Sequence, residues 1–381
     1  MRRTETAAED TGKISAATSV DHQKTIDRKT IDVVISTYDE ERYVGRCLDE
    51  VLAQDYPAEL VRVWLVDGGS QDRTVAIASE RAATDRRLTV IADGRRRNLP
   101  EALNLGIRGS SNELVAKVDA HGYPERDFLS RAVDVLRCSP SDVACVGGRP
   151  EQHGDTRFGE AVALARTSHF GVGGSVYSGR TEHEFVDTVQ CGVYRRAALE
   201  HVGLFDPAMA YGEDEELNWR LRQAGCRLLL DTSIRFHYIT RPSWRAVFRQ
   251  YYRYGRARVR VCRAHHTMVR PRHLAPASFL LAFVGLAGAS IFIPRARLAL
   301  AVGALAYTVA ALMSAVAAVG RAHGDGPAPD VVVAGGRPDE WSAMTAEVAA
   351  CSKIAVCFGA LHTGYGLGTL RGLLDRSRQH A

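Results

Sequence analysis

Short apolar runs alternate with amphipathic stretches along the first half of the chain. Five runs, rich in Val, Ile and Leu, have the length of buried β-strands; they lie at 31–37, 61–66, 88–91, 114–118 and 143–147. Stretches with helical spacing of apolar residues lie between them at 42–54, 73–84 and 100–108. This alternation predicts an α/β fold with a mainly parallel sheet and helices on both of its faces.

The pattern of apolar and polar residues changes twice in the second half of the chain. After a less regular region from 148 to 187, the pattern predicts a strand within 189–194, helices near 196–201 and 214–224, and a basic, aromatic amphipathic helix at 243–257. Residues 274–293 and 298–319 are free of charge and long enough to cross a bilayer, although a pair of buried helices in a soluble domain has the same pattern. Residues 354–370 are Gly-rich and carry His362, which leaves open a third short span, a re-entrant segment or an interfacial helix. A Gly/Pro-rich connection is expected at 325–340.

The charge distribution and the cysteine content indicate the surface that the protein binds and the compartment in which it lies. The 381 residues carry a net charge of +5, but residues 241–272 hold ten arginines and no acidic residue. Such a segment suits anionic lipid headgroups or phosphates. The eight cysteines show no Cys-x-x-Cys pair and no zinc spacing, as expected of small buried residues in a reducing compartment. Residues 1–29 are polar throughout, which predicts a disordered tail and no signal peptide.

The apolar run at 114–118 contains and is followed by the first candidate functional residues. Lys117 is its only charged residue, Asp119 follows the run, and His121 comes two residues later. Ligands bind beyond the carboxyl ends of strands in open α/β sheets, and an Asp and a His at this spacing can hold a divalent metal. The same pattern also occurs at an ordinary strand-to-turn junction. A dinucleotide-binding site is excluded at the first strand, because residues 36–41 contain three acids and no glycine-rich turn.

Several motifs in a fixed order then point to one family. They are Ser-Thr-Tyr-Asp-Glu-Glu at 36–41, Asp-Gly-Gly-Ser-x-Asp-x-Thr at 67–74, Asp-Ala-His at 119–121, Phe-Asp-Pro at 205–207 and Tyr-Gly-Glu-Asp-Glu-Glu-Leu-Asn-Trp-Arg at 211–220. Together they resemble family 2 glycosyltransferases of the GT-A fold, and most closely the membrane-attached bacterial enzymes that build exopolysaccharides such as succinoglycan. The resemblance covers roughly residues 31–260.

The resemblance implies a nucleotide-sugar site formed by Thr37, Tyr38, Glu40, Asp67, Arg95, Asn98, Lys117 and Asp119. Thr37 and Tyr38 would line the base, and Asp67 would accept a hydrogen bond from the base N3–H, which favours uracil. Asp67 is also a natural turn former before two glycines. Asn98 suits the start of a helix, and at least one of the arginines at 95–97 would reach the donor phosphates.

The family's metal motif falls on Asp119 and His121, so the resemblance implies a bound Mg²⁺ or Mn²⁺ that neutralises the diphosphate. An imidazole in place of the second carboxylate favours Mn²⁺. His237 follows a predicted strand and is a candidate third ligand, with a structural role as the alternative.

The catalytic acidic pair falls on Glu213 and Asp214. Asp214 would be the base that removes the acceptor hydroxyl's proton, with Glu213 in support. The alternative is that the acids at 213–216 only stabilise the positive end of a helix.

Acceptor or diphosphate contacts are implied at Gln190, Gln250, Arg253 and Tyr254. The last three resemble the Gln-x-x-Arg-Trp signature of processive synthases, with Tyr in place of Trp. The alternative for this helix is to lie on anionic lipid through its basic face, and the two roles are compatible.

The sequence therefore predicts five regions: a tail at 1–29, a GT-A catalytic domain at 30–240, a basic interfacial segment at 241–273, a transmembrane hairpin at 274–320, and a loop with a third helix at 321–381. We expect an inverting, metal-dependent hexosyltransferase in the cell membrane with a cytoplasmic catalytic domain. It would move sugar from a nucleotide-diphosphate sugar, with UDP-sugars as the first candidates, to a polyprenyl-diphosphate-linked acceptor, and would bind membrane lipid but no nucleic acid. A processive synthase, a polyprenyl-phosphate sugar synthase and a non-catalytic sugar-nucleotide-binding scaffold are the alternatives.

Overall fold

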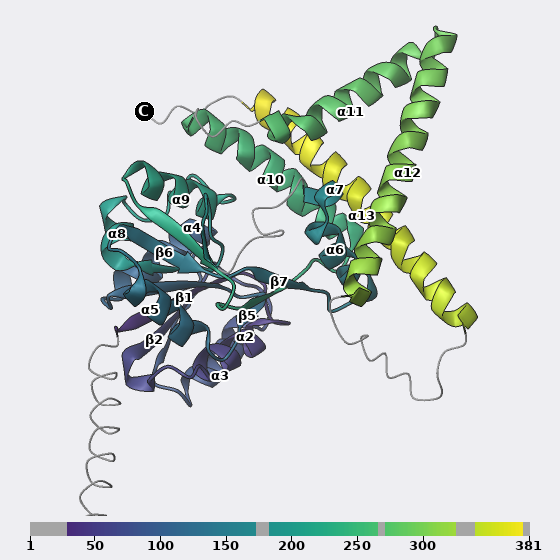
Figure 1. The fold of residues 1–381 in the computed structure, drawn as a ribbon. Coiled ribbons are helices and arrows are strands. Elements are labelled where there is room, and N and C mark those ends of the chain that lie inside the picture. The colour runs from purple at the N-terminus through teal and green to yellow at the C-terminus, as the bar shows by residue number, and fades with distance from the viewer. Residues whose placement is uncertain (1–28, 173–182, 266–270, 325–339, 376–381) are drawn as a thin grey trace, which may run out of the picture.

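A computed structural model describes residues 29–172, 183–265, 271–324 and 340–375. Within them, an α/β unit is joined to a group of long C-terminal helices, α10 to α13 (Figure 1). Nearly all of the tail predicted at 1–29, and most of the connection predicted at 325–340, lie outside the described residues.

The α/β unit consists of short strands and helices in the predicted alternation. Its strands are β1 (Ile31–Thr37), β2 (Val61–Asp67), β3 (Leu88–Ile91), β4 (Leu114–Asp119), β5 (Gly122–Pro124), β6 (Val143–Gly147), β7 (Pro150–His153), β8 (His183–Phe185), β9 (Val193–Arg195), β10 (Arg227–Asp231) and β11 (Phe236–Ile239). Its helices are α2 (Val44–Leu52), η1 (Ala58–Leu60), α3 (Thr74–Ala82), α4 (Leu99–Gly109), α5 (Phe128–Cys138), α6 (Arg157–Thr167), α7 (His169–Val172), α8 (Arg196–His201) and α9 (Glu213–Gln223). The chain ends in α10 (Trp244–Ala264), α11 (Pro271–Ala289), α12 (Pro294–Gly324) and α13 (Glu340–Leu374).

The main sheet has the strand order β3-β2-β1-β4-β9-β6-β10-β8. The neighbouring strands β3, β2, β1 and β4 are parallel to one another, and β6 is parallel to β10. β9 and β8 are antiparallel to their neighbours. The predicted mainly parallel sheet is therefore confirmed. The carboxyl ends of β2, β1 and β4 lie in register, because Thr37 pairs with Asp67 and Ser36 pairs with Asp119.

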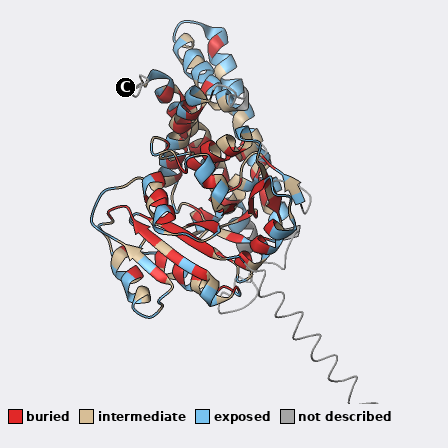
Figure 2. Ribbon diagram, turned by 90° about the vertical axis from the view of Figure 1, so that its left-hand side faces the viewer, coloured by how far each residue is buried: buried red, intermediate tan, exposed pale blue. Residues whose placement is uncertain are grey.

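Helices cover both faces of this sheet, because alternate residues of each strand point to opposite sides. In β1, Ile31, Val33 and Ile35 pack with α2 and α5, whereas Val34 packs with α4, α8 and α9. The strands of the sheet are accordingly among the most deeply buried parts of the molecule (Figure 2). Asp32 is the buried exception in β1, and its carboxylate accepts hydrogen bonds from Arg196 at 2.9 Å and Trp64 at 3.1 Å.

A second sheet, β5-β11-β7, adjoins the end of β4. The chain turns at Ala120 and His121 between β4 and β5, and β11 then pairs antiparallel with β5 and parallel with β7. The short sheet therefore lies beside the strand end that carries Asp119.

The C-terminal helices explain the Gly-rich stretch at 354–370. It lies inside α13, where an added Cβ at Gly364, Gly366 or Gly368 would come within 2.1–2.8 Å of a carbonyl oxygen of α10 or α11. Small residues let two helix backbones approach closely. His362 contacts the Tyr307 hydroxyl at 2.9 Å and the Phe170 carbonyl oxygen at 2.8 Å. The stretch is thus part of one continuous helix that packs closely against α10 and α11.

One helix among the described residues is long and apolar enough to cross a membrane, namely Pro294–Ala322 of α12. Only 17% of its most apolar window is buried within the protein. The apolar part of α11, His273–Ala289, is shorter, so the structure differs from the predicted pair of full-length spans. The two helices are joined at 290–293, where Arg297 donates hydrogen bonds to the carbonyl oxygens of Ser290 and Ile291.

Candidate active site

Lys117 lies at the centre of the candidate site. Its ammonium nitrogen is 2.6 Å from an Asp214 oxygen, 3.1 Å from a Glu213 oxygen and 3.3 Å from an Asp119 oxygen. The Lys117 side chain is 3% exposed. Glu213 and Asp214 open α9 and Asp119 ends β4, so one buried cation joins three carboxylates from distant parts of the sequence.

The local fold fixes Lys117 in this place. Neighbouring strands β4 and β9 are antiparallel, and the backbone N–H of Lys117 donates to the Gly192 carbonyl oxygen at 3.0 Å. Gly192 ends the turn at 190–192, in which Cys191 has a left-handed φ of 47°. The Cys191 thiol contacts the second Asp119 oxygen at 3.6 Å. The turn that contains Gln190 therefore borders the three-carboxylate cluster.

The charges of this cluster are strongly coupled. Burial disfavours the ammonium form of Lys117, but the surrounding carboxylates raise its pKa well above the usual value. Burial also raises the pKa of Asp214 to about 7, with Lys117 opposing the rise and Glu213 and Asp119 adding to it. Asp119 is different: burial acts to raise its pKa, but Lys117 and His121 outweigh that and lower it. Lys117 thus stays charged while Asp214 titrates near neutrality.

One oxygen of Asp214 is left available. Its Oδ2 holds Lys117, whereas its Oδ1 is buried and has no hydrogen-bond partner within the described ranges. A buried carboxylate oxygen without a donor is costly and is expected at a site where a ligand supplies the missing proton. The other acids of the α9 start have partners of their own: Glu215 pairs with Arg258 at 2.5 Å, and Glu216 pairs with Arg220 at 2.7 Å. Each acid at 213–216 therefore pairs with a lysine or arginine side chain, so these acids do more than stabilise a helix end.

His121 extends the site from Asp119 towards β1 and β11. Its Nδ1 is 3.4 Å from a Glu40 oxygen, and its ring meets the Tyr238 ring edge-on with centroids 4.8 Å apart. Burial acts against a charged imidazole, but Tyr238 and Glu40 raise the pKa of His121 to about 9. This corner of the site therefore favours a positive charge.

The predicted acceptor residues on α10 reach the same corner. Gln250 donates from its amide to the Tyr238 hydroxyl at 3.2 Å and to the Tyr254 hydroxyl at 3.1 Å. Arg253 donates to the Tyr211 hydroxyl at 2.8 Å, just before the acidic start of α9. The Gln-x-x-Arg-Tyr segment is thereby connected to His121 through Tyr238, rather than lying free on the surface of the α/β unit.

The nucleotide-binding candidates lie at the ends of β1 and β2. Asp67 accepts hydrogen bonds from the Gly69 and Ser70 backbones, both at 2.9 Å, and from the Thr37 hydroxyl at 3.3 Å. Its turn-forming role is thus present in the structure, and Thr37 is held beside it. Tyr38 is 41% exposed.

The loop before α4 faces these strand ends. Arg96 lies over the Tyr38 ring, with its guanidinium carbon 4.5 Å from the ring centroid. Arg97 is bound to Asp93 at 2.5 Å, whereas the Arg95 side chain is 81% exposed. Asn98 caps α4 in a capping box and donates to the Pro207 carbonyl oxygen at 2.9 Å. Of the three arginines, Arg95 is the least engaged.

His237 is not brought to Asp119 and His121. Successive residues of a strand point to opposite faces, and on β11 it is Tyr238 that faces His121. The ring nitrogens of His237 instead contact His153 at 2.7 Å and Glu125 at 2.8 Å. The sequence reasoning missed both partners of this cluster on β7, Glu151 and His153, although their spacing in an extended segment would place both side chains on one face.

Comparison with known proteins identifies similar chains. A family model described as "Glycosyl transferase family 2" matches residues 32–203. A dolichyl N-acetyl-alpha-D-glucosaminyl phosphate 3-beta-D-2,3-diacetamido-2,3-dideoxy-beta-D-glucuronosyltransferase of Methanococcus voltae is 28% identical over 234 residues, which are 60% of this chain and 72% of that protein. The succinoglycan biosynthesis protein ExoA of Rhizobium meliloti is 29% identical over 247 residues, which are 64% of this chain and 73% of that protein.

The fold comparison extends over most of the chain. The mannosyltransferase PcManGT of Pyrobaculum calidifontis, solved in complex with GDP-Man and Mn²⁺, superposes with a TM-score of 0.53 at 20% identity. The match covers 92% of this chain and 88% of that one. Residues 32–203 therefore match a glycosyl transferase family 2 domain, and the chain has a GT-A-like fold.

Proposed function

We propose that the protein is an inverting glycosyltransferase that moves a hexose from a nucleotide-diphosphate sugar, with UDP-sugars as the first candidates, to a lipid-linked saccharide at the membrane surface. The observation that carries the proposal is Asp214, a buried carboxylate whose pKa of about 7 suits a general base and whose Oδ1 lacks a partner in the described part of the chain. The names of the relatives, one acting on a dolichyl-linked sugar and one in succinoglycan synthesis, support this acceptor class.

In this mechanism Asp214 accepts the proton of the acceptor hydroxyl while that oxygen attacks the anomeric carbon from the face opposite the nucleotide. Lys117 holds Asp214 at 2.6 Å and remains charged, so it fixes the carboxylate's orientation and disfavours its premature protonation. Glu213 supports the cluster from the neighbouring position, 3.1 Å from Lys117. Gln190, in the turn beside the cluster, and Gln250 and Arg253, on α10, would meet the acceptor or the diphosphate.

The donor nucleotide would lie over the ends of β1 and β2. Thr37 and the exposed Tyr38 would line the base, Asp67 would face its N3–H, and Glu40 the ribose. Arg95, 81% exposed, and Asn98, at the start of α4, would approach the phosphates. Helix N-termini and arginine side chains both favour phosphate groups.

A divalent metal, Mn²⁺ or Mg²⁺, fits the residues at the end of β4. Asp119 ends β4, His121 follows two residues later, and the His121 Nδ1 is 3.4 Å from a Glu40 oxygen, so these three residues would hold the metal. Such a donor set suits Mn²⁺ better than Mg²⁺. When bound, the metal would neutralise charge on the diphosphate leaving group.

The C-terminal helices support a membrane setting. The exposed apolar surface of α12, with Leu298, Leu305 and Met313 each at least 65% exposed, would lie in lipid. The basic α10, which is joined to the active site by Gln250 and Arg253, would then lie near the membrane interface on the cytoplasmic side. This arrangement would deliver a lipid-borne acceptor directly to Asp214.

The test is a donor and acceptor screen on the purified protein in detergent. Nucleotide release is measured for a panel of UDP-, GDP- and dTDP-sugars with Mn²⁺, Mg²⁺ or EDTA, each with and without polyprenyl phosphate or a polyprenyl-diphosphate-linked sugar. The proposal predicts single-sugar transfer that needs the linked acceptor. Long products from one donor without that acceptor would support a processive synthase, and use of bare polyprenyl phosphate would support a polyprenyl-phosphate sugar synthase.

A further inference from the structure

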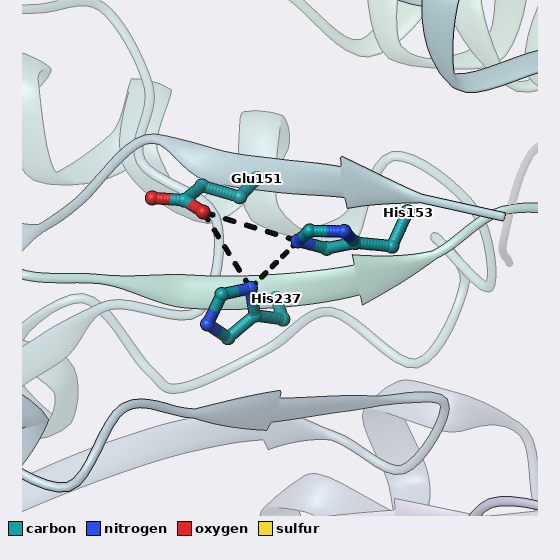
Figure 3. A group of neighbouring side chains, drawn as sticks. All are labelled: Glu151, His153 and His237. Carbon is teal, nitrogen blue, oxygen red and sulfur yellow. Dashed lines mark hydrogen bonds and ion pairs between the residues drawn. The ribbon is translucent and has the colours of Figure 1, made fainter. Parts of the chain in front are cut away.

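We infer that Glu151, His153 and His237 form a second metal site, specific for Zn²⁺ or a similar transition metal, on the three-stranded sheet (Figure 3). Their nearest ligand atoms all lie within 4.8 Å of one another. Glu151 and His153 come from β7, and His237 comes from β11. The site is separate from the Lys117 cluster and does not depend on the proposed transfer reaction.

Strand register builds this cluster. β7 and β11 are parallel, with Glu151 directly opposite His237. His153 is two residues beyond Glu151 on the same strand, so both side chains project from the same face of the sheet. Figure 3 shows the three side chains converging from the two strands. The His237 ring is also stacked on Tyr123 of β5, with centroids 4.6 Å apart, which limits its rotation.

The distances between the ligand atoms lie on either side of the separation that a tetrahedral ion requires. His153 Nε2 is 2.7 Å from His237 Nδ1, and the Glu151 oxygen is 3.8 Å from the former and 3.6 Å from the latter. Ligands about 2.0–2.1 Å from a tetrahedral Zn²⁺ are roughly 3.3 Å apart, which lies inside this spread. The two ring nitrogens would have to move apart by about 0.6 Å, and the Glu151 oxygen would have to approach them by about 0.3–0.5 Å, to reach that separation.

The far nitrogen of His237 has the partner expected of a metal ligand. Its Nε2 is 2.8 Å from a Glu125 oxygen. A carboxylate on the outer nitrogen holds that nitrogen protonated, so the lone pair of Nδ1 points into the cluster. Metal-binding histidines usually have such a carboxylate or carbonyl behind them. Glu125 therefore fixes the tautomer that a metal needs.

The types of ligand indicate which metal this site would bind. Two imidazoles and one carboxylate form a common zinc set in which water takes the fourth position, whereas Mg²⁺ and Ca²⁺ prefer oxygen ligands. His153 and Glu151 are 44% and 39% exposed, so water reaches the open position. Arg235 lies 3.5 Å from the outer oxygen of Glu151 and balances part of the negative charge without occupying the ligand oxygen.

A metal bound by Glu151, His153 and His237 would link β7 to β11 behind the active site. β11 carries Tyr238, which packs against His121, and the Ile239 N–H donates to the His121 carbonyl oxygen at 3.0 Å. Binding would therefore stabilise the position of the strand that lines the corner next to Asp119.

The experiment measures Zn²⁺ and Co²⁺ binding to the full-length protein, purified without a polyhistidine tag and stripped of metal, with no nucleotide sugar present. The wild-type protein is expected to bind one equivalent tightly, to give the intense visible spectrum of four-coordinate Co²⁺, and to melt at a higher temperature with Zn²⁺. His153→Gln and Glu151→Gln should each weaken binding by at least tenfold, because even the loss of an outer-shell partner of a metal ligand costs about 10–100-fold in affinity.

Two control variants separate this site from other ligands. Asp119→Asn removes a candidate ligand of the donor metal, and His201→Gln removes an exposed histidine at the end of α8; both should keep the Co²⁺ spectrum. Because His153 is half-exposed, its replacement should leave the fold intact, and the melting temperature of the metal-free variants verifies this. Absence of one-equivalent binding in the wild type, or unchanged binding in both His153→Gln and Glu151→Gln, would overturn the inference.

Discussion

Replacing Lys117 by Met tests whether one ammonium holds the active-site carboxylates together. The substitution keeps most of the side chain's volume but removes a charge that is 3% exposed and lies 2.6–3.3 Å from three carboxylates. Removing one partner from a buried ion pair costs about 3–5 kcal/mol, because the remaining charge is left without compensation. At roughly 2–4 °C per kcal/mol, the melting temperature should fall by ~6–20 °C.

The loss should depend on pH in a defined direction. Without Lys117, the pKa of Asp214 should rise further above its present value of about 7, because the ammonium is the group that lowers it. Protonation then relieves the repulsion among the carboxylates, so Lys117→Met should lose less stability at pH 6 than at pH 8. Each unit of pKa change corresponds to about 1.4 kcal/mol.

The assay is thermal unfolding in detergent, followed by tryptophan fluorescence at both pH values. Lys29→Met is the matched control, because the Lys29–Glu113 pair has a similar distance, 2.9 Å, but side chains 51% and 56% exposed. An exposed pair contributes about 0–1 kcal/mol, so this variant should melt close to the wild type. If the two variants lose equally little stability at pH 8, the reasoning about the buried cluster is refuted.

Three further changes probe other parts of the account. The proposed base Asp214, with a pKa of about 7, predicts a transfer rate that rises roughly tenfold per pH unit below pH 7 and levels off above it, and a flat profile from pH 5 to 7 would contradict the proposal. Gly368→Val should lower the melting temperature, since an added Cβ would lie 2.1 Å from the Tyr252 carbonyl oxygen, while Gly285→Val, with no atom within 4 Å of its Cβ, should not. Gln250→Leu should raise the KM for the acceptor more than that for the donor, because its amide connects α10 to the active-site corner; an equal effect on both would argue against an acceptor role.

The sequence predicts the strand ends of the site well, because their geometry follows from the fold class. Once β1, β2 and β4 are parallel neighbours, Thr37, Asp67 and Asp119 must end at the same edge of the sheet. The family resemblance identified Asp214 through its motif at the start of a predicted helix. No local sequence pattern specifies which strand end that helix faces.

The family resemblance placed Lys117 among the nucleotide-sugar residues, whereas the structure buries it among three carboxylates, an arrangement that the sequence could not predict. In the sequence it is a single charge within an apolar strand, and the partners that justify its burial, Glu213 and Asp214, are 96 and 97 residues away. The antiparallel insertion of β9 beside β4 also has no sequence signal of its own. Helix α5, by contrast, has the apolar spacing of Phe128, Ala132 and Leu136, a signal that sequence reasoning could have used.

The glycine content of 354–370 left several placements open in the sequence for a physical reason. Small residues permit close helix packing in lipid and in a folded protein alike. In 354–370 they allow α13 to pack closely against α10 and α11, while the exposed apolar surface is concentrated on α11 and α12.

The most direct test of the central claim is a comparison of Asp214→Asn with Glu215→Gln under saturating donor and lipid-linked acceptor. Asp214→Asn keeps the shape of the side chain but removes the base, so kcat should fall by about 10²–10⁴-fold while the KM for the donor changes little. Glu215, the next residue, pairs with Arg258 outside the cluster, and its variant should retain most of the activity. Full transfer activity in Asp214→Asn would contradict the assignment of the catalytic base.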